Sequence, residues 1–293
     1  MEVVENEEDM IIIAESGATK TSWRSVGNEG TVRSADTAGM NPSTYDADHF
    51  RATAAQAMSV LNPDGEHVDK VYFYGAGLVT TASVAPISDA LREWCPDAFV
   101  DFRSDLLAAA RALFGDGEGI VAIMGTGSNT CYYKDGKIVL NYRPGGFILG
   151  DDGSAAALGK AFMSDYVRSL LPLEVERMFH KEYEMPYQEV VENVYRKPGA
   201  AAFLGSFAPF VLKNINEPTG YLRSLVDGCM DSFMKCALAR YKEYSGGEVK
   251  VGVAGSFGCA CEEYVREAGK RYGLEFEKFL KSPIDELLRY HGI

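Results

Sequence analysis

A loop of small residues in the middle of the chain has the composition of a phosphate-binding turn. Residues 120–124 are apolar without interruption, which predicts a buried strand, and residues 130–133 predict a second one. The loop between them reads Gly125-Thr126-Gly127-Ser128-Asn129. Glycines let the backbone approach a ligand, and the short polar side chains add donors, so the loop suits a phosphate. An ordinary glycine-rich turn has the same composition, and this loop alone does not separate the two interpretations.

The same plan occurs a second time near the N-terminus. Residues 11–14 are apolar, and they lead into a second polar loop, Glu15-Ser16-Gly17-Ala18-Thr19-Lys20-Thr21. An offset of 109 residues, the separation of Thr21 from Thr130, also places Trp23 on Tyr132. The repetition favours a ligand-binding role for both loops over two unrelated turns.

Each loop is followed by a second strand, a turn and a short third strand. The turns are at 27–30 and 134–137, and the third strands are expected at 31–35 and 138–141. Two strand–loop–strand–turn–strand units in one chain predict a duplicated architecture. Two such loops facing each other would clamp a polyphosphate from both sides.

Length and charge restrict the kind of protein and of partner. The chain has 293 residues, more than one hydrophobic core usually covers, which predicts two domains. A formal charge of −13 argues against nucleic acid as a partner, although ATP stays possible through Mg²⁺, one lysine and backbone amides. No apolar run is long enough for a membrane span, and residues 1–9 are acidic, unlike a signal peptide. We therefore expect a cytoplasmic protein.

The cysteines show no metal-binding or redox spacing. They contain no C-x-x-C pair and no neighbouring histidine, and they stand at Cys95, Cys131, Cys229, Cys236, Cys259 and Cys261. We expect all six to be buried thiols that behave as small hydrophobic side chains.

Strands and helices alternate after each meander, which predicts a mixed sheet with helices on its faces. In the first half we expect helices and strands in turn at 46–61, 71–74, 84–94, 99–102 and 105–114. In the second half a glycine-rich connection, 143–159, precedes a helical region to 210 that is broken at Pro172, Pro186 and Pro198. The remaining expected elements are a helix at 219–244, a strand at 249–254, a helix at 259–272, a strand near 274–276 and a helix at 283–290 that packs back on the first domain.

This arrangement resembles the sugar kinase, actin and heat-shock ATPase superfamily. More closely it resembles the N-acetylglucosamine kinase family, which is grouped with the ATPases that activate benzoyl-CoA reductase and 2-hydroxyacyl-CoA dehydratases. The resemblance covers nearly the whole chain and depends on five segments in order: 15–21, 104–111, 125–129, 145–154 and 255–256.

The resemblance implies an α/β fold of two duplicated ribonuclease-H-like domains, of the actin and hexokinase type, with a central cleft. The first domain would cover 1–116 with the C-terminal helix 281–293, and the second, nucleotide-binding domain would cover 117–280. It also implies the reaction, transfer of the γ-phosphoryl group of ATP to a hydroxyl of an amino sugar, usually the 6-hydroxyl. Closure about a hinge near 113–119 would keep water from the γ-phosphate.

Asp105 is the predicted catalytic base. It follows a strand and begins an alanine-rich helix, so its carboxylate would face the cleft and take the proton of the sugar hydroxyl. The simpler interpretation is that Asp105 only caps the helix.

The nucleotide would be bound by both loops and by a third turn. The implied phosphate ligands of the first loop are Gly17, Thr19, Lys20 and Thr21. Those of the second loop are Gly125, Thr126, Gly127 and Ser128, and Gly255 and Ser256 would lie against the adenine. The alternatives are a solvated hairpin lysine at Lys20 and a plain strand-to-helix turn at Gly255.

The sugar would be bound by carboxylate and amide groups. The implied ligands are Asn41, Asp105, Asn129, Gly146, Phe147 and Asp151, with Asp152 behind them. Phe147 stands where the family often has Trp, and a polar turn without a ligand is the alternative for Asp151 and Asp152.

Glu15 departs from the family pattern, which usually has Asp there to hold Mg²⁺ through water. Glutamate is longer by one methylene, so it could hold the metal directly or hold it poorly. The sequence thus keeps three functions open: an amino-sugar kinase, a regulatory ATPase that activates a partner enzyme, and a non-catalytic sugar or nucleotide sensor. N-acetylglucosamine, N-acetylmuramic acid and glucosamine all remain possible substrates, and the family suggests a homodimer.

Overall fold

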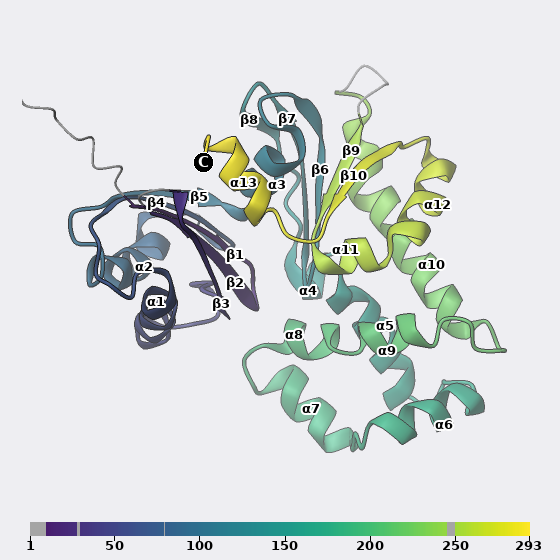
Figure 1. Cartoon of the computed structure of the whole chain (residues 1–293). Helices are drawn as coiled ribbons and strands as arrows, with labels where there is room; N and C mark the ends of the chain where they lie inside the picture. The colour runs from purple at the N-terminus through teal and green to yellow at the C-terminus, as the bar shows by residue number, and fades with distance from the viewer. Residues whose placement is uncertain (1–9, 28–29, 79, 245–249) are drawn as a thin grey trace, which may run out of the picture. The chain divides into compact units, whose positions relative to one another are not determined.

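The computed structural model describes residues 10–27, 30–78, 80–244 and 250–293 (Figure 1). The acidic segment 1–9 and the start of the strand expected at 249 lie outside the described residues. The chain divides into two compact units. Unit 1 comprises Met1–Ala112 and Pro283–Ile293, and unit 2 comprises Leu113–Ser282.

Among the described residues, unit 1 contains a five-stranded mixed sheet in the order β3-β2-β1-β4-β5. The first three strands form an antiparallel meander, and β1, β4 and β5 run parallel. The strands are β1 Met10–Ser16, β2 Lys20–Val26, β3 Val32–Ala38, β4 Val68–Gly75 and β5 Phe99–Ser104. Because parallel strands end at the same edge of a sheet, the carboxyl ends of β1, β4 and β5 lie side by side.

Helices cover both faces of this sheet (Figure 1). On one face, α1 (Ala47–Leu61) and α2 (Thr81–Arg92) bury side chains against Ile12, Ala14 and Trp23. On the other face, α3 (Asp105–Phe114) and α13 (Ile284–Tyr290) pack against Ile13 and Tyr74. The alternation of strand β1 thus separates two cores: even-numbered side chains face α1, and odd-numbered ones face α3.

Unit 2 repeats the sheet of unit 1. Its described strands follow the order β10-β9-β6-β7-β8, which is the same topology read from the other edge. They are β6 Glu118–Met124, β7 Ser128–Lys134, β8 Lys137–Leu140, β9 Val251–Ala254 and β10 Phe276–Leu280. The predicted duplicated α/β architecture is confirmed at the level of sheet topology.

The residue-by-residue offset of 109 is wrong. Thr21 pairs with Ser16 directly at the mouth of the first loop, whereas Thr130 pairs with Ala122, two residues inside the second hairpin. The first hairpin has four residues between its last paired positions, and the second has three, between Met124 and Ser128. Strand order is repeated, but the loops differ in length, so one offset does not align both strands of each hairpin.

The helical region of unit 2 is divided as the prolines predict. Pro172 and Pro186 each stand at the N-cap position of a helix, where a missing N–H costs nothing. The helices are α4 Gly146–Leu149, α5 Ala155–Val167, α6 Leu173–Glu182, α7 Tyr187–Tyr195, α8 Ala200–Gly205 and α9 Ala208–Lys213.

Four expected boundaries are corrected. The helix expected at 84–94 begins at Thr81, because Thr80 and Ser83 form a capping box. The helix expected at 259–272 is two helices, α11 (Ser256–Ala260) and α12 (Glu262–Tyr272), and the strand expected near 274 is β10, later in the chain. The long helix expected at 219–244 is regular only over α10, Tyr221–Phe233, and continues as a π-helical turn and a 3₁₀ turn to Tyr241.

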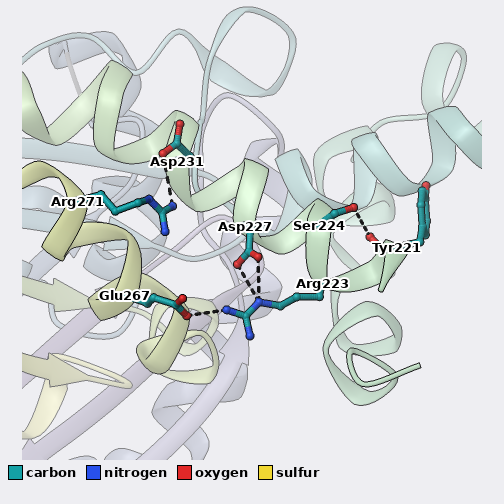
Figure 2. Close-up of polar contacts among 7 residues, drawn as sticks. All are labelled: Tyr221, Arg223, Ser224, Asp227, Asp231, Glu267 and Arg271. Carbon is teal, nitrogen blue, oxygen red and sulfur yellow. Dashed lines mark hydrogen bonds and ion pairs between the residues drawn. The ribbon is translucent and has the colours of Figure 1, made fainter. Parts of the chain in front are cut away.

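Ion pairs fix α10 against α12 (Figure 2). Arg223 of α10 donates from Nε to Asp227 one turn along the same helix and from Nη2 to Glu267 of α12. Asp231, a further turn along, accepts from Arg271 at 3.4 Å. The end of α10 is therefore held in place at the point where the helix becomes irregular.

Candidate functional site

Asp105 lies at the carboxyl edge of the unit 1 sheet. The strand register aligns Ser16, Gly75 and Ser104, so the residues that follow these three positions share one edge. Neighbouring strands are about 4.8 Å apart, so β1 and β5 end roughly 10 Å from each other. The edge therefore brings Glu15 near the end of β1 and Asp105 at the start of α3 into one region of unit 1.

The structure does not favour the interpretation that Asp105 only caps helix α3. Ser104 occupies the N-cap position of α3, and its hydroxyl accepts the N–H of Leu107 at 3.2 Å. Burial of the carboxyl group raises the pKa of Asp105 to about 6, although the N–H of Leu106, which Asp105 accepts at 2.8 Å, lowers it. A helix start that already has a cap leaves the carboxylate of Asp105 available for another role.

The pKa of the Glu15 carboxyl group is also raised. Burial raises the pKa of Glu15 to about 7, and the negative charge of Asp105 adds to the rise, while Lys20 opposes it. A buried carboxyl group whose pKa is raised further by a neighbouring carboxylate is a common arrangement at functional sites. A cation bound at Glu15 would favour the ionised form of its carboxyl group.

The residues of the first loop point in different directions. Thr19 and Lys20 are exposed, and Gly17 closes the turn by donating its N–H to the carbonyl of Lys20. Lys20 forms an exposed ion pair with Asp36 at 2.9 Å, which is close to the solvated-lysine alternative. Thr21 is fully buried, and its hydroxyl lies within hydrogen-bond distance of Ser16 Oγ and the Ala38 carbonyl. The structure therefore does not bring the hydroxyl of Thr21 to the surface as expected of a phosphate ligand.

Asn41 lies beside the same edge. Its side-chain oxygen accepts the N–H of Ser43 at 2.9 Å. A Cβ atom at Gly77, in the turn that follows β4, would come within 2.5 Å of that oxygen. Asn41 thus packs against the β4 turn, on the side of the sheet edge that also carries Asp105.

The second loop is bound tightly to the start of α5. The carbonyl of Gly125 accepts the N–H of Ala155 at 2.9 Å, and that of Thr126 accepts the N–H of Ala156 at 3.1 Å. Ser128 donates its hydroxyl to the carbonyl of Asp152 at 2.7 Å. The hydroxyl of Ser128 is thus used inside unit 2, and the loop is held by neutral backbone contacts rather than by charges.

Asp151 lies directly against this loop. Its backbone is in the left-handed region, at φ 54°, which is uncommon for a residue other than glycine. A Cβ atom at Gly127 would lie 2.8 Å from its Oδ2, so the glycine is needed to seat this carboxylate. Burial raises the pKa of Asp151, although N–H groups of Ser128 and Gly146 and the charge of Lys160 lower it.

The other expected sugar ligands of unit 2 lie close to Asp151 in the chain and in space. Gly146 and Phe147 begin the short helix α4, and Lys160 donates to the carbonyl of Phe147 at 2.6 Å. Asn129 accepts from the Asn141 side chain at 2.9 Å. Unit 2 therefore presents Asn129, Asp151 and the start of α4 around one loop.

Gly255 has a backbone reason to be glycine. It adopts φ 125°, and a Cβ atom there would lie 2.3 Å from the carbonyl oxygen of Met124. Ser256 is the first residue of α11, so the pair stands at a strand-to-helix turn beside the second loop. The close approach that this glycine allows is therefore to β6, and an adenine contact stays a prediction.

A pocket of about 150 Å³ opens beside Asn129 in unit 2. Besides residues expected at the site, it is lined by Tyr142, Arg143 and Arg240, which sequence reasoning did not single out. Arg143 lies just before the motif at 145–154, and its charge was the available signal. Arg240 was not detectable, because its position depends on the irregular end of α10.

The cysteines are less uniformly buried than predicted. Cys95, Cys131 and Cys261 are buried, Cys229 and Cys259 are partly buried, and Cys236 is exposed and lines the pocket beside Asn129. The expectation of six buried thiols is wrong for Cys236, since it lies on the exposed side of the π-helical turn, away from the buried Met234 and Leu238. No described helix is long and apolar enough to span a membrane.

The carboxylate of Glu15 fits a magnesium ion that would be bound partly by substrate. Among the described residues no group of three or more His, Cys, Asp or Glu side chains could form a complete metal site. Mg²⁺ in nucleotide-dependent enzymes is commonly held by one or two carboxylates plus phosphate oxygens and water. Glu15 would supply one such carboxylate, which leaves Asp105 free to act as a base.

Comparisons with known proteins give one close relative and many more distant ones. No family model and no curated protein sequence matches the chain. The structure is similar to that of the putative N-acetylglucosamine kinase from Porphyromonas gingivalis, with a TM-score of 0.86 and 33% identity over 96% of this chain and 98% of that chain. The putative N-acetylglucosamine kinase from Chromobacterium violaceum gives a TM-score of 0.74 at 18% identity, covering 96% and 98% of the two chains.

A more distant match extends the fold similarity. The ROK family glucokinase from Streptomyces griseus, solved with glucose and AMPPNP, has a TM-score of 0.57 and 15% identity, covering 96% of this chain and 97% of that chain. At this identity the similarity shows the fold alone. Two five-stranded mixed sheets among the described residues are thus part of a wider two-domain fold.

Proposed function

The chain belongs to the N-acetylglucosamine kinase family and is an ATP-dependent sugar kinase, and we propose that its acceptor is an amino sugar. N-acetylglucosamine, phosphorylated at the 6-hydroxyl, is the proposed substrate. The observation that carries the proposed chemistry is the pair Glu15 and Asp105, whose residues share one sheet edge and whose carboxyl groups both have raised pKa values. The 33% identity to the Porphyromonas gingivalis protein supports the choice of sugar.

In the proposed reaction Asp105 acts as the general base. Above a pH of about 6 its carboxylate is ionised and can take the proton of the sugar 6-hydroxyl. The hydroxyl oxygen then forms a bond to the γ-phosphorus as the bond to the β-phosphate oxygen breaks, so that the products are a sugar 6-phosphate and ADP. The proton ends on Asp105 and passes to solvent.

The remaining residues position the reactants. Asn41 and Asp105 from unit 1, and Asn129, Phe147 and Asp151 from unit 2, would bind the sugar. A sugar hydroxyl bound by buried carboxylate and amide groups is selected strongly, because an analogue without it leaves those groups unpaired. Phosphoryl transfer depends mainly on such positioning and on charge stabilisation.

The loops would bind the nucleotide. Gly17, Thr19 and Lys20 would contact the phosphates from one side, and Gly125, Thr126 and Gly127 from the other. Glu15 would hold Mg²⁺, which when bound offsets the negative charge of the phosphates. Membership in the subgroup of reductase-activating ATPases and a homodimeric assembly remain predictions.

A second candidate, a non-catalytic sensor, is favoured by one observation. A pKa of about 7 leaves much of Glu15 protonated at neutral pH in the absence of a cation, and a protonated carboxyl group binds metal poorly. If Glu15 holds the metal weakly, sugar and nucleotide would bind without turnover.

One assay separates these functions. ADP release is measured with N-acetylglucosamine, N-acetylmuramic acid, glucosamine and glucose, and without sugar. Release that depends on an amino sugar supports the kinase, with the 6-phosphate identified by mass spectrometry and NMR. Slow release that is independent of sugar would indicate a regulatory ATPase, and binding without release would indicate a sensor; either result contradicts the proposal.

A further inference from the structure

The pocket beside Asn129 contains residues to which the proposed reaction assigns no role, among them Tyr142, Arg143 and Arg240. Its volume of about 150 Å³ is close to that of cavities that accept a benzene-sized guest, which is too small for a whole sugar but sufficient for a substituent. Its walls come from β7, from the connection after β8 and from the end of α10. They are Ser128, Asn129, Thr130, Tyr142, Arg143, Pro144, Leu149, Gly150, Asp152, Cys236, Ala237 and Arg240.

Two guanidinium groups line this pocket. Arg143 and Arg240 are both exposed, and neither forms an ion pair with any residue in the described ranges. The single carboxylate in the lining, Asp152, is engaged at Oδ1 by the hydroxyl of Ser232 at 2.5 Å. In a chain with a net charge of −13, a polar pocket with two arginines is a local exception, and it would favour an anion.

The side chain of Arg240 is held in place by an aromatic platform. Its Cζ lies 3.6 Å from the centroid of the Tyr142 ring, a close cation–π contact. Tyr142 is fixed in turn by Tyr241, which is fully buried and whose hydroxyl accepts the N–H of Tyr142 at 3.1 Å. The same hydroxyl donates to the carbonyl of Thr130 at 2.9 Å. Arg240 is thus tied to the strand that carries Asn129.

The irregular end of α10 places these residues. The π-helical turn Met234–Leu238 contributes Cys236 and Ala237 to the lining, and the 3₁₀ turn that follows contributes Arg240. Single π-helical turns often occur at functional sites, because the extra residue changes which face the helix presents. The ion pairs of Arg223 and Arg271 hold the regular part of α10 (Figure 2), so the change is confined to the pocket.

We propose that this pocket is a subsite for a carboxylate substituent on the sugar, bound by Arg143 and Arg240. Asn129 is common to the pocket and to the proposed sugar site, so a substituent on a bound sugar could reach it. Guanidinium groups bind carboxylates through paired, charge-assisted hydrogen bonds. The enzyme would therefore accept acidic amino sugars in addition to neutral ones. This inference rests on the proposed function, because it takes Asn129 to be a sugar ligand.

The test compares a sugar with and without the carboxylate. N-acetylmuramic acid is N-acetylglucosamine with a lactyl ether, so the pair differs by the group of interest. Dissociation constants for both sugars are measured by calorimetry in the absence of nucleotide, for the wild type, R143Q and R240Q. R177Q is the matched control, because Arg177 is an exposed arginine of α6 outside the pocket.

We expect either pocket variant to weaken binding of N-acetylmuramic acid about tenfold and to change binding of N-acetylglucosamine by less than about twofold, while R177Q changes neither. Failure of the wild type to bind N-acetylmuramic acid, or equal weakening of both sugars, would overturn the proposal. A rise in KM for ATP without loss of acidic-sugar binding would also overturn it, because the arginines would then serve the nucleotide phosphates. If the wild type binds both sugars but releases no ADP, the kinase assignment fails while the subsite stands.

Discussion

The two hairpin loops have the same place in the same sheet topology, yet they are built from different chemistry. The loop of unit 1 carries charges: Glu15 and Lys20 flank it, and Asp105 lies at the same edge. The loop of unit 2 contains no charged residue, and backbone bonds from Ala155 and Ala156 hold it against α5. The loop of unit 1 is therefore partly exposed and flanked by titratable groups, whereas the loop of unit 2 is neutral and is held in place by hydrogen bonds.

This difference indicates a division of labour after duplication. If the neutral loop of unit 2 binds the polyphosphate as proposed, it would do so without a change of charge during the reaction. The proposed proton acceptor Asp105 and the proposed metal ligand Glu15 are both in unit 1. The comparison predicts that substitutions in unit 1 change turnover and pH dependence, and that substitutions in unit 2 change binding.

The largest expected effect comes from the carboxylate of unit 1. Asp105→Asn should lower turnover at least about a hundredfold, because the amide cannot accept the proton of the sugar hydroxyl. Nucleotide binding should stay nearly intact, as measured by titration with a fluorescent ATP analogue. In the wild type, kcat/KM should rise with pH through a pKa near 6 and then level off.

The matched control is Asp89→Asn, an exposed aspartate of α2 in the same unit. It should leave turnover and the pH profile unchanged. Near-normal turnover of Asp105→Asn would show that Asp105 is not the catalytic base, and it would contradict the proposed division of labour between the units.

The second effect contrasts the glycines of the two loops. In Gly127→Ala the new Cβ would lie 2.8 Å from Oδ2 of Asp151, so the carboxylate must move. In Gly17→Ala the nearest atom is the Lys20 carbonyl oxygen at 3.7 Å, an ordinary contact. We expect Gly127→Ala to raise KM for the sugar at least about tenfold and Gly17→Ala to change it less than about twofold.

Circular dichroism melts of both variants separate this effect from unfolding. Because the clash at Gly127 is with the end of a side chain, Tm should fall by only a few degrees. Equal sugar KM values in the two alanine variants would mean that Asp151 does not depend on the loop, and unit 2 would lose its assigned part in sugar binding.

The third effect is on stability and follows from the pKa of Glu15. The pKa of this carboxyl group is 4.5 in the unfolded chain and about 7 in the folded protein. Its contribution to stability is therefore complete below pH 4.5 and is lost as the pH rises through 7. Glu15→Gln removes this titration. The free energy of unfolding of the variant, minus that of the wild type, should therefore increase by about 1–3 kcal/mol between pH 5 and pH 8.

Tryptophan fluorescence suits this measurement, because the two tryptophans, Trp23 and Trp94, both belong to unit 1. Glu93→Gln, at an exposed position of the same unit, should show no such trend. Saturating Mg²⁺ and ATP should reduce the difference, since a bound cation stabilises the ionised carboxylate. A difference in unfolding free energy that stays constant with pH would show that folding does not raise the pKa of Glu15.

Sequence patterns predicted the architecture better than they predicted the site. The repeated meander, the proline-delimited helices and the strand-to-helix position of Asp105 were all readable, because they depend on local periodicity and on backbone chemistry. The offset of 109 was misjudged: the last paired residues give 108 for the first strands (Ser16 and Met124) and 107 for the second (Thr21 and Ser128), because the first loop is one residue longer. Arg240 and Tyr142 were not predicted, because a π-helical turn and a buried tyrosine hydroxyl bring them together across about 100 residues of chain.

The smallest expected effect tests whether Lys20 belongs to the charged loop or to the surface. Its ion pair with Asp36 joins two side chains that are 57% and 59% exposed, and such pairs contribute at most about 1 kcal/mol. Asp36→Asn would free the ammonium group, so KM for ATP should fall by about two- to fivefold if Lys20 serves the phosphates. The gain should shrink in high salt, where exposed charges are screened.

Asp64→Asn is the matched control, because it breaks the comparable exposed pair of unit 1 with Arg33 at 3.1 Å. It makes the same change in net charge, so a general electrostatic effect on ATP would appear in both variants. An unchanged KM in Asp36→Asn would assign Lys20 to a surface ion pair. The charge of the unit 1 loop would then reside in Glu15 and Asp105 alone, and the phosphates would depend more on the neutral loop of unit 2.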